Sequence, residues 1–318
     1  MPFVSVIVPN YNHALYLDKR LQSILDQTYQ DYEIIILDDC STDNSREVIE
    51  RYRNHSKVTH IVFNETNSGS TFKQWRKGLE LAKGEWIWIA ESDDYCSPEL
   101  LSKLLQLTSG RDNIVLSYCQ SLEVDGDKPG RDMSWYTDKI SKDYWKTDHY
   151  TAGLDEIKQY LLLANTIPNA SAVIFKKDAY SSVDRKFETM KMCGDWLFYV
   201  EILRKGDLAF CAEPHNYFRI HQATTRFEGR TTKWKTVLEE EYQVISQTGK
   251  HLSPKFKAKV AQKKLQLVLS YCSLYSIDEI KRFLLKPGSY RKPIPRAYFL
   301  SIYLLRHAFG SVKKLFSR

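Results

Sequence analysis

The sequence predicts an α/β fold in which a mostly parallel sheet is flanked by helices. Two observations predict it. Strand-like and helix-like segments alternate along the first 118 residues, and polar or acidic residues follow several of the strand-like segments. Strand, helix, strand at this spacing implies right-handed crossovers between parallel strands. We therefore expect the polar residues to gather at one edge of the sheet, as a binding site requires and core packing does not.

Short apolar runs rich in Val, Ile and aromatic residues are typical of buried strands. They lie at Phe3–Pro9, Tyr32–Leu37, Val58–Phe63, Trp86–Ala90 and Ile114–Tyr118. Apolar residues at helical spacing predict the helices between them, at Leu15–Leu25, Ser45–Tyr52, Phe72–Ala82 and Pro98–Leu107. Ser41 and Asp43 are candidate N-caps of the second helix.

The second half of the chain is less regular. A strand is predicted at Pro168–Phe175, after a polar loop, and a helix at Leu197–Arg204, after Cys193–Trp196. Residues 120–152 show no clear periodicity, and we interpret them as an insertion that could act as a mobile lid. Further helices are predicted at Lys233–Gln247, Pro254–Tyr275 and Ile277–Leu285.

Composition and length are those of a globular protein. The 318 residues suffice for one large domain with an appendage or for two domains, and 43% hydrophobic with 27% charged residues excludes a disordered chain. The six cysteines are scattered without a CxxC pair or zinc spacing, which indicates reduced thiols in a cytosolic protein. No signal peptide is recognised before the first strand, and no run of ~18 apolar residues predicts a membrane span.

Positive charge is concentrated in the last part of the sequence. From Lys281 onward the chain has ten Lys or Arg and no Asp or Glu, whereas the first 280 residues carry 36 basic and 39 acidic residues. Aromatic and aliphatic residues stand beside the basic ones at 297–309 and 312–318, which suits an amphipathic helix on an anionic membrane. The alternative is a helix packed on the body of the protein. Nucleic-acid binding is disfavoured because the basic residues form no groove-reading motif.

The acidic run Glu91-Ser92-Asp93-Asp94 is the most informative segment. It follows the apolar strand Trp86–Ala90, and clustered carboxylates at the end of a buried strand are costly unless a cation neutralises them. A divalent metal is the simplest solution, and the carboxyl end of a strand is where α/β sheets bind ligands. The alternative is a solvated acidic turn before the helix that starts near Pro98.

Five motifs occur in order along the chain. They are Val8-Pro9-Asn10-Tyr11-Asn12, Leu37-Asp38-Asp39-Cys40-Ser41-Thr42-Asp43, Asn67-Ser68-Gly69, Ala82-Lys83-Gly84-Glu85-Trp86-Ile87 and Glu91-Ser92-Asp93-Asp94. Together they resemble the family-two inverting glycosyltransferases of bacterial polysaccharide synthesis, which have the GT-A fold. The resemblance extends from about residue 3 to about residue 225. It implies a Rossmann-like half, a nucleotide-diphosphate sugar as donor and Mn²⁺ or Mg²⁺ as cofactor.

The resemblance and the helices predicted after about residue 230 together imply a division of the chain. Residues 1–230 would form the GT-A glycosyltransferase domain, with a nucleotide-sugar half at 1–118 and an acceptor half at 119–230. Residues 231–318 would form a helical extension that ends in the basic amphipathic tail.

The resemblance assigns roles to particular residues. Asp195 corresponds to the catalytic base, and the metal falls to Asp93 and His221. Asp94, Trp196 and Arg219 are acceptor or supporting residues. The nucleotide sugar is expected to contact Pro9, Tyr11, Asp39, Gly69, Lys73, Glu91, Ser92 and Asp93.

Elementary chemistry permits the nucleotide-binding roles. The ring of Tyr11 could stack on a base, and the carboxylate of Asp39 could accept a base N–H. The small loop 67–70 precedes a helix N-terminus, which favours anions, so it could approach a diphosphate closely. Lys73 or Arg76 could reach a phosphate, and the alternative for both is a solvated helix charge.

Several roles compete with a structural one. Asp195 also suits a helix N-cap, Trp196 a core position and His221 the surface. Asp38 could bind sugar or simply hold its loop. The chain departs from the family pattern at Glu91, where Asp is usual, at Gly194, where Glu is usual, and at Gln74-Trp75-Arg76, where an Arg-Asn pair is common.

The predicted reaction is transfer of the sugar to an acceptor hydroxyl with inversion. A UDP-sugar is the expected donor, with thymidine and guanosine nucleotides as alternatives, and the expected acceptor is a saccharide or a lipid-linked saccharide. The expected location is the cytoplasm, at the inner-membrane surface if the tail binds there. Three alternatives remain. The first is a nucleotide-sugar-binding protein that has lost catalysis. The second is a nucleotidyltransferase, which usually has a glycine-rich basic loop where this chain has Pro9–Asn12, and the third is a membrane-peripheral scaffold, which would leave the acidic sheet edge unexplained.

Overall fold

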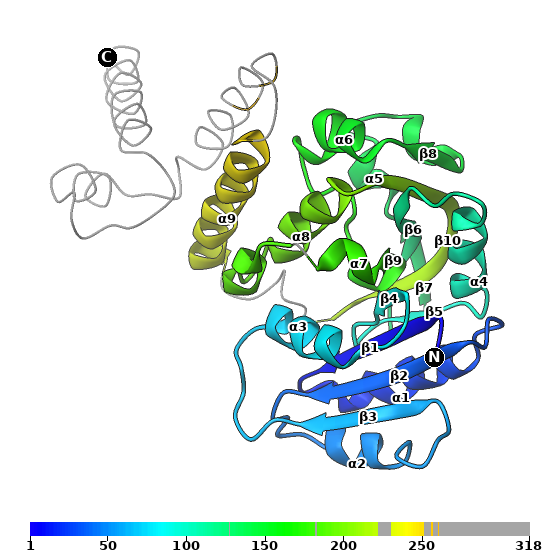
Figure 1. The fold of residues 1–318 in the computed structure, drawn as a ribbon. Coiled ribbons are helices and arrows are strands. Elements are labelled where there is room, and N and C mark those ends of the chain that lie inside the picture. The colour runs from blue at the N-terminus through cyan, green and yellow to red at the C-terminus, as the bar shows by residue number, and fades with distance from the viewer. Residues whose placement is uncertain (127, 182, 222–229, 251–255, 257–259, 261–318) are drawn as a thin grey trace, which may run out of the picture. The chain divides into compact units, whose positions relative to one another are not determined.

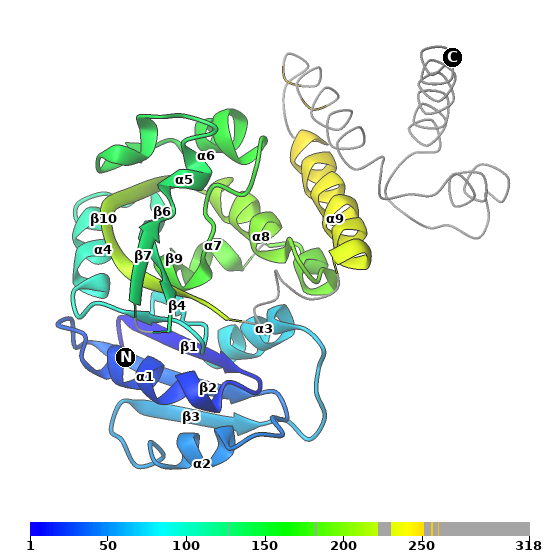
Figure 2. The same ribbon diagram turned by 180° about the vertical axis from the view of Figure 1, so that it is seen from behind.

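The computed structural model describes residues 1–126, 128–181, 183–221 and 230–250, together with positions 256 and 260. The chain divides into two compact units, Met1–Thr224 and Thr225–Arg318. The first unit is built on one sheet (Figures 1 and 2). In the second unit the structure describes α9 (Arg230–Lys250), which contains the helix predicted at 233–247. The helix predicted at 277–285, the basic tail and most of the helix predicted at 254–275 lie outside the described residues.

The sheet has ten strands within the described residues, and its order is β3-β2-β1-β4-β9-β6-β10-β5, with β7 paired to β6 and β8 to β10. Their bounds are β1 (Val4–Asn10), β2 (Tyr32–Asp38), β3 (Val58–Phe63), β4 (Trp86–Ile89), β5 (Tyr95–Cys96), β6 (Ile114–Asp125), β7 (Lys128–Asp132), β8 (His149–Thr151), β9 (Val173–Lys176) and β10 (Asp207–Ile220).

The helices of the first unit lie between these strands in sequence. They are α1 (Ala14–Leu25), α2 (Ser45–Glu50), α3 (Thr71–Leu81), α4 (Leu100–Thr108), α5 (Ser134–Thr137), α6 (Gly153–Glu156), α7 (Lys177–Tyr180) and α8 (Gly194–Leu203). Single 3₁₀ turns occur at Tyr144–Lys146, Ala170–Ala172 and Arg185–Thr189, and a π-helical turn at Ile157–Leu161. Among the described residues, none of the helices has both the length and the apolar character needed to cross a membrane.

Helices cover both faces of the central strand β1. Its Val4, Val6 and Val8 are buried in one apolar cluster with the inner side of α1. Alternate residues of a strand point to opposite faces, and Ile7 faces α3 on the other side. Gly78 allows this close approach, because a Cβ there would lie 2.3 Å from Cγ2 of Ile7. Burial on both faces explains why β1 is a continuous apolar run.

Six strands end at the same edge of the sheet. β3, β2, β1 and β4 are parallel to one another. β9 runs antiparallel to both β4 and β6, and β10 is parallel to β6, so β6 and β10 end at the same edge as β4. The predicted α/β fold and the parallel arrangement of its first strands are confirmed, whereas β5, β7, β8 and β9 pair antiparallel with their neighbours. The polar residues that follow β1, β2 and β4 lie at the shared edge.

The strand and helix boundaries of the second half differ from the prediction. β6 continues to Asp125 and pairs with β10 over this length, and β7 and β8 also join the sheet, so an irregular insertion at 120–152 is wrong for these parts. The period-2 pattern past Tyr118 was too mixed in polarity to be recognised. The strand predicted at 168–175 is shorter, because the side chain of Asn169 accepts a hydrogen bond from the Ser171 amide and starts a 3₁₀ turn.

Two further boundaries matter for the site. α8 begins at Gly194, so Asp195 lies inside its first turn rather than before a helix at Leu197. β10 extends to Ile220, so Arg219 lies inside this strand and His221 directly follows it. Asp43, a candidate cap of α2, accepts the amide of Ser45 and also the first amide of α1.

Candidate active site

Asp38 ties together the loops that follow β1 and β2. Asn10 and Asp38 are neighbours in the parallel register, and Nδ2 of Asn10 donates to Oδ2 of Asp38 at 2.8 Å. The amide and hydroxyl of Ser41 donate to the same carboxylate at 2.9 and 2.6 Å. Asp38 therefore holds its loop, which is the second of its predicted alternatives.

Asp39 is buried and fixes the loop in front of α3. Its Oδ1 accepts hydrogen bonds from Asn64 Nδ2, the Ser68 amide and Gln74 Nε2 at 2.6, 2.9 and 2.8 Å. Its Oδ2 accepts one from the Ser68 hydroxyl at 2.7 Å. A carboxylate oxygen can accept more than one hydrogen bond, so Oδ2 retains the capacity that the predicted base contact needs.

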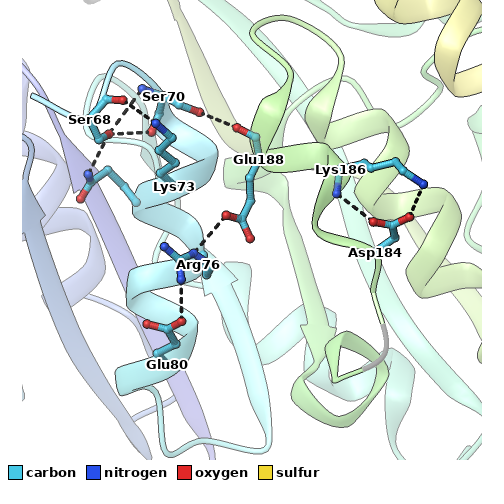
Figure 3. Close-up of polar contacts among 9 residues, drawn as sticks. Ser68, Ser70, Lys73, Arg76, Glu80, Asp184, Lys186 and Glu188 are labelled. Carbon is cyan, nitrogen blue, oxygen red and sulfur yellow. Dashed lines mark hydrogen bonds and ion pairs between the residues drawn. The ribbon is translucent and has the colours of Figure 1, made fainter.

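The loop 67–70 presents its backbone to open space. Gly69 has φ +69°, the left-handed conformation that favours glycine, and apart from its chain neighbours no residue comes within 4 Å of the position of a Cβ. Lys73 projects back from the first turn of α3, and its Nζ donates to the carbonyl of Ser68 at 3.0 Å (Figure 3). The structure thus places the Lys73 ammonium beside the glycine loop.

Arg76 lies one turn further along α3 and faces other partners. Its guanidinium lies 3.0 Å from a carboxylate oxygen of Glu80 and 3.0 Å from one of Glu188, which belongs to the 3₁₀ turn 185–189 (Figure 3). The hydroxyl of Ser70 reaches the carbonyl of Glu188 at 3.5 Å. Of the two basic residues considered for a phosphate, Arg76 is the one that pairs with carboxylates within the part of the chain that the structure describes.

The side chain of Glu91 turns toward α3. Trp75 donates its indole N–H to Oε1 of Glu91 at 2.8 Å, and the Glu91 amide donates to Oγ of Ser171 at 3.1 Å. Burial and the neighbouring Asp93 carboxylate raise the pKa of Glu91 to about 8. Two departures from the family pattern, the Glu at 91 and the Trp at 75, are therefore in contact with each other.

Asp93 and His221, the two predicted metal ligands, lie together. His221 directly follows β10, and its Nε2 is 3.1 Å from Oδ2 of Asp93. The Asp93 side chain is 18% exposed and the His221 side chain is 9% exposed. Burial acts to raise the pKa of Asp93, but the hydrogen bond to His221 and the charges of His13 and His221 lower it below its usual range. The carboxylate of Asp93 is thus ionised at neutral pH.

Arg219 and Asp94 hold the acidic run in place. The Arg219 amide donates to Oδ1 of Asp94 at 3.1 Å. The buried guanidinium donates to the carbonyls of Asp93 and Gly126 at 2.9 and 2.6 Å, which links the ends of β4 and β6. Burial and the Asp93 carboxylate raise the pKa of Asp94 to about 7. These contacts fix the acidic run against β10.

His13 is a residue that the sequence analysis missed. It follows Asn12 in the loop after β1, and its Nδ1 lies 2.8 Å from Oγ of Ser92. One ligand atom each from His13, Asp93 and His221 lie within 4.8 Å of one another. Burial lowers the pKa of His13, so its imidazole is neutral at pH 7. The sequence feature that could have identified His13 is its position directly after the polar residues that follow the first strand.

A cavity of about 590 Å³ opens beside these histidines. Its lining includes His13, Tyr16, Asp125, Arg219 and His221. The Tyr16 ring lies 4.8 Å from the His221 ring and 4.8 Å from the Arg219 guanidinium. The cavity gives a ligand access to the cluster.

Asp195 is positioned by Asn165 and by its own helix. Nδ2 of Asn165 donates to Oδ2 of Asp195 at 3.0 Å, and the Trp196 amide donates to Oδ1 at 2.7 Å. Burial, followed by the charges of Asp195 and Glu91, raises the pKa of the Tyr199 phenol well above its usual value. The start of α8 and the acidic run also share a neighbour: the Phe72 ring of α3 packs against Gly194, and Trp75 of the same helix donates to Glu91.

The start of α8 is packed tightly against α3. A Cβ at Gly194 would lie 2.5 Å from the Phe72 ring and 2.6 Å from the carbonyl of Phe187, so a Glu at this position does not fit. Trp196 is buried, and its indole N–H donates to the carbonyl of Leu161 at 2.9 Å. Trp196 thus occupies a core position, the structural alternative predicted for it.

The remaining predicted residues lie at the end of β1. Pro9 is buried within the strand, and Tyr11 beyond it is 45% exposed. Asn165, which contacts Asp195, was also missed. It lies in a segment without periodicity, and no local motif marks it.

Comparison with known proteins identifies similar glycosyltransferases. Residues 5–161 match the model of a family described as glycosyl transferase family 2. A segment of 110 residues is 38% identical to "Putative teichuronic acid biosynthesis glycosyltransferase TuaG" of Bacillus subtilis, and covers 35% of this chain and 43% of that protein. The chain therefore spans less than half the length of this relative.

Solved structures show the same fold at low sequence identity. Staphylococcus aureus TarS 1-349 in complex with UDP-GlcNAc has a TM-score of 0.62 at 16% identity, covering 98% of this chain and 92% of that chain. The mannosyltransferase PcManGT from Pyrobaculum calidifontis, in complex with GDP-Man and Mn²⁺, has a TM-score of 0.56 at 15% identity, covering 97% and 88%. The predicted GT-A fold is confirmed.

Proposed function

The chain belongs to glycosyl transferase family 2, and on this premise we propose that it moves a sugar from a nucleotide-diphosphate sugar to an acceptor hydroxyl with inversion. One observation carries the proposal. The acidic run after β4 and the start of α8, which carries Asp195, both contact α3: Trp75 donates to Glu91, and the Phe72 ring packs against Gly194. Charge for a leaving diphosphate and a base for the acceptor are thereby available together.

The donor site is proposed on the nucleotide half. Asp39 fixes the loop 67–70, and this loop and Lys73 would contact the diphosphate. Pro9 and Tyr11 would hold the base. Glu91 and Ser92 would contact the ribose or sugar. A UDP-sugar is the proposed donor, supported by the TarS complex with UDP-GlcNAc, while the Pyrobaculum mannosyltransferase is in complex with GDP-Man.

Asp93 and His221 would hold a Mn²⁺ or Mg²⁺ ion. Their facing oxygen and nitrogen, 3.1 Å apart at the rim of a cavity, are ligand atoms suited to a divalent cation. Such a cation, when bound, neutralises negative charge that develops on the leaving diphosphate. The Pyrobaculum neighbour contains Mn²⁺.

Asp195 is the proposed general base. Its carboxylate would take the proton of the acceptor hydroxyl as this attacks the anomeric carbon from the face opposite the diphosphate. Asn165 and the first turn of α8 fix the carboxylate, so little reorientation is needed. Attack from the opposite face inverts the configuration, and an α-linked donor would yield a β-glycoside.

The two departures that favoured a catalytically impaired protein have structural explanations. Gly194 is required by the packing of α8 on Phe72, and Glu91 has the length that reaches Trp75. Neither substitution removes Asp93 or Asp195. These contacts favour an active enzyme over a protein that only binds nucleotide sugar.

The proposed setting is synthesis of a cell-surface polysaccharide, with a saccharide or lipid-linked saccharide as acceptor. The name of the Bacillus relative supports this setting. The proposed location is the cytoplasm, with the basic tail on the inner membrane surface. The proposed division of the chain is at residue 230.

Donor binding and turnover test the function separately. A thermal-shift screen of UDP-GlcNAc, UDP-glucose, UDP-galactose and GDP-mannose with Mn²⁺ identifies the donor, because ligands of the folded state raise its apparent stability. Release of the nucleotide diphosphate with water or added saccharides then reports turnover, and EDTA should abolish it. Binding without turnover would favour the impaired protein, and release of pyrophosphate would favour a nucleotidyltransferase.

The variant Asp195→Asn tests the assignment of the base. Turnover should fall about 10²–10⁴-fold, while the donor Kd from calorimetry stays within about twofold of the wild type. Asp178→Asn, an exposed acid on α7, is the control. Turnover equal to the wild type in Asp195→Asn would refute the assignment.

A further inference from the structure

Three side chains that can bind a metal meet at the edge of the sheet, and the proposed function uses two of them. The third, His13, comes from the loop after β1, whereas Asp93 and His221 follow β4 and β10. The ligand atoms of the three lie within 4.8 Å of one another, and the rings of His13 and His221 meet edge to face with centroids 5.6 Å apart. Small side-chain shifts would bring all three within the ~2.0–2.2 Å at which imidazole and carboxylate bind transition metals.

His13 does not serve the helix that it precedes. It occupies the N-cap position of α1, where Ser, Thr, Asp or Asn is preferred, and its side chain makes no capping hydrogen bond. Asp43 satisfies the first amide of the helix instead, with its Oδ2 accepting from Ala14 at 2.9 Å. The Asp43 carboxylate also offsets the positive end of the helix dipole, which would otherwise repel a cation. Capping therefore does not explain the histidine at this position.

Ser92 orients the imidazole of His13. The Ser92 side chain is 1% exposed, and its Oγ lies 2.8 Å from Nδ1 of His13. When the hydroxyl oxygen accepts a hydrogen bond from Nδ1–H, the lone pair of the ring is on Nε2, as metal binding through Nε2 requires. A polar partner on the second nitrogen is usual for metal-binding histidines. This contact gives the serine of the acidic run a function of its own.

We propose that His13 is a third protein ligand of the metal, with Ser92 as its positioning residue, and that the site prefers Mn²⁺ to Mg²⁺. The inference deepens the proposed function and rests on it for the presence of a divalent cation. Mg²⁺ selects oxygen ligands and gives up its water reluctantly, whereas imidazole suits the later first-row ions. Two imidazoles and one carboxylate therefore disfavour Mg²⁺ more than the acidic run alone would.

Calorimetric titration with MnCl₂ or MgCl₂ alone, without donor, tests the proposal. The wild type should bind Mn²⁺ at least about tenfold more tightly than Mg²⁺. His13→Ala should lose about 100-fold in Mn²⁺ affinity, and Ser92→Ala about tenfold. Far-UV circular dichroism and thermal unfolding verify that the variants fold. His55→Ala, which removes an exposed histidine after α2, is the matched control and should bind as the wild type does.

Pulsed electron paramagnetic resonance of bound Mn²⁺ supplies a spectroscopic readout. Nitrogen modulation should correspond to two imidazoles in the wild type and one in His13→Ala. Wild-type Mn²⁺ affinity and unchanged nitrogen modulation in His13→Ala would overturn the proposal, as would equal affinity of the wild type for both ions. These measurements do not depend on sugar transfer. If the protein showed no turnover but bound Mn²⁺ through His13, the proposed function would be refuted and the metal-ligand proposal would stand.

Discussion

Asp39 and Asp93 lie at the same edge of the sheet, but their partners differ in kind. The carboxylate of Asp39 accepts four hydrogen bonds from neutral donors of three surrounding side chains and one backbone amide group. Asp93 faces two histidines at the rim of a cavity, with Nε2 of His221 at 3.1 Å. The first carboxylate is enclosed by its own chain, whereas the second is placed among groups that a cation can use.

The difference separates two tasks that the sequence pattern does not distinguish. A carboxylate with several neutral donors stabilises a loop, since its charge is solvated by the protein itself. A carboxylate that shares a small space with Glu91, Asp94 and histidines gains most from an external ion, and both neighbouring acids have raised pKa values in the protein alone. Substitutions at the two kinds of site should therefore have different effects, on stability in one case and on activity in the other.

Among the substitutions that test this comparison, the largest effect is expected for Asp93→Asn. Turnover should fall by roughly 10³-fold, about 4 kcal/mol in activation free energy, because a metal ligand is lost while the shape of the side chain is kept. The melting temperature should change by less than about 3 °C, since Asp93 supports no loop in the way Asp39 does. Nucleotide release and thermal unfolding measure the two quantities, with the exposed Asp31→Asn as control. A large loss of stability with little loss of turnover would reverse the comparison.

Much of the fold was predictable because the first half of the chain has strong local signals. β1, β2 and β4 are buried on both faces, so their apolar runs are unbroken, and the helices between them have regular periodicity. β6 and β10 were harder, because they carry polar residues such as Gln120 and Asn216 at buried positions. The long pairing of β6 with β10 accommodates those residues. This pairing is a tertiary contact, so the sequence pattern of either strand does not reveal it.

The site was predictable only where a motif names the residue. Asp93, His221 and Asp195 belong to segments that resemble a family pattern, and the structure brings the first two into contact. His13 and Asn165 act through partners 79 and 30 positions away in sequence, Ser92 and Asp195. Such partners become visible only when strand order is known, because the loops that meet are set by the sheet and not by their sequence separation.

Glu156 extends the comparison to a carboxylate that is buried away from this edge. It is 0% exposed and accepts hydrogen bonds from the hydroxyls of Tyr144 and Thr166 at 2.8 and 3.4 Å. Burial raises its pKa from 4.5 to about 7, so two neutral hydroxyls do not solvate its charge fully. The folded state therefore prefers protonated Glu156. Its contribution to the free energy of unfolding falls as the pH rises from about 4.5 to about 7 and is constant above.

Glu156→Gln should remove this fall. At pH 8 the variant should be more stable than the wild type by up to about 3 kcal/mol, since one pKa unit corresponds to about 1.4 kcal/mol, and the difference should shrink steadily toward pH 5. Urea unfolding at pH 5, 6, 7 and 8 measures it, with Glu47→Gln on the surface of α2 as control. Parallel stability curves for the variant and the wild type would show that the buried carboxyl is better solvated than its partners indicate.

Asp39→Asn tests whether the enclosed carboxylate stabilises the loop in front of α3. The new amide group would place an N–H₂ against donors that now meet an oxygen, so about 2 kcal/mol of stability should be lost. The loop 64–74 should also become more open to proteolysis, because Ser68 and Gln74 lose their common acceptor. Urea unfolding gives the loss of stability and limited proteolysis locates it, with Asp178→Asn as the exposed control. An unchanged midpoint would mean that Asp39 is held for ligand binding rather than for the loop.

The smallest effect expected concerns two basic residues of α3, and it applies the same reasoning to cations. Arg76 already lies 3.0 Å from carboxylate oxygens of Glu80 and Glu188, whereas Lys73 meets the carbonyl of Ser68 beside the glycine loop (Figure 3). Lys73→Ala should therefore weaken donor binding about tenfold, or ~1.4 kcal/mol. Arg76→Ala should leave the donor Kd within about twofold and cost under about 1 kcal/mol of stability, as is usual for partly exposed ion pairs. Each variant is the control for the other in calorimetry with UDP-GlcNAc and Mn²⁺. A larger loss of donor affinity in Arg76→Ala than in Lys73→Ala would contradict this reasoning. It would mean that a side chain with ion-pair partners in its own chain can still bind the ligand. The hydrogen bonds of Asp39 would then not indicate whether Asp39 stabilises the loop or binds the donor.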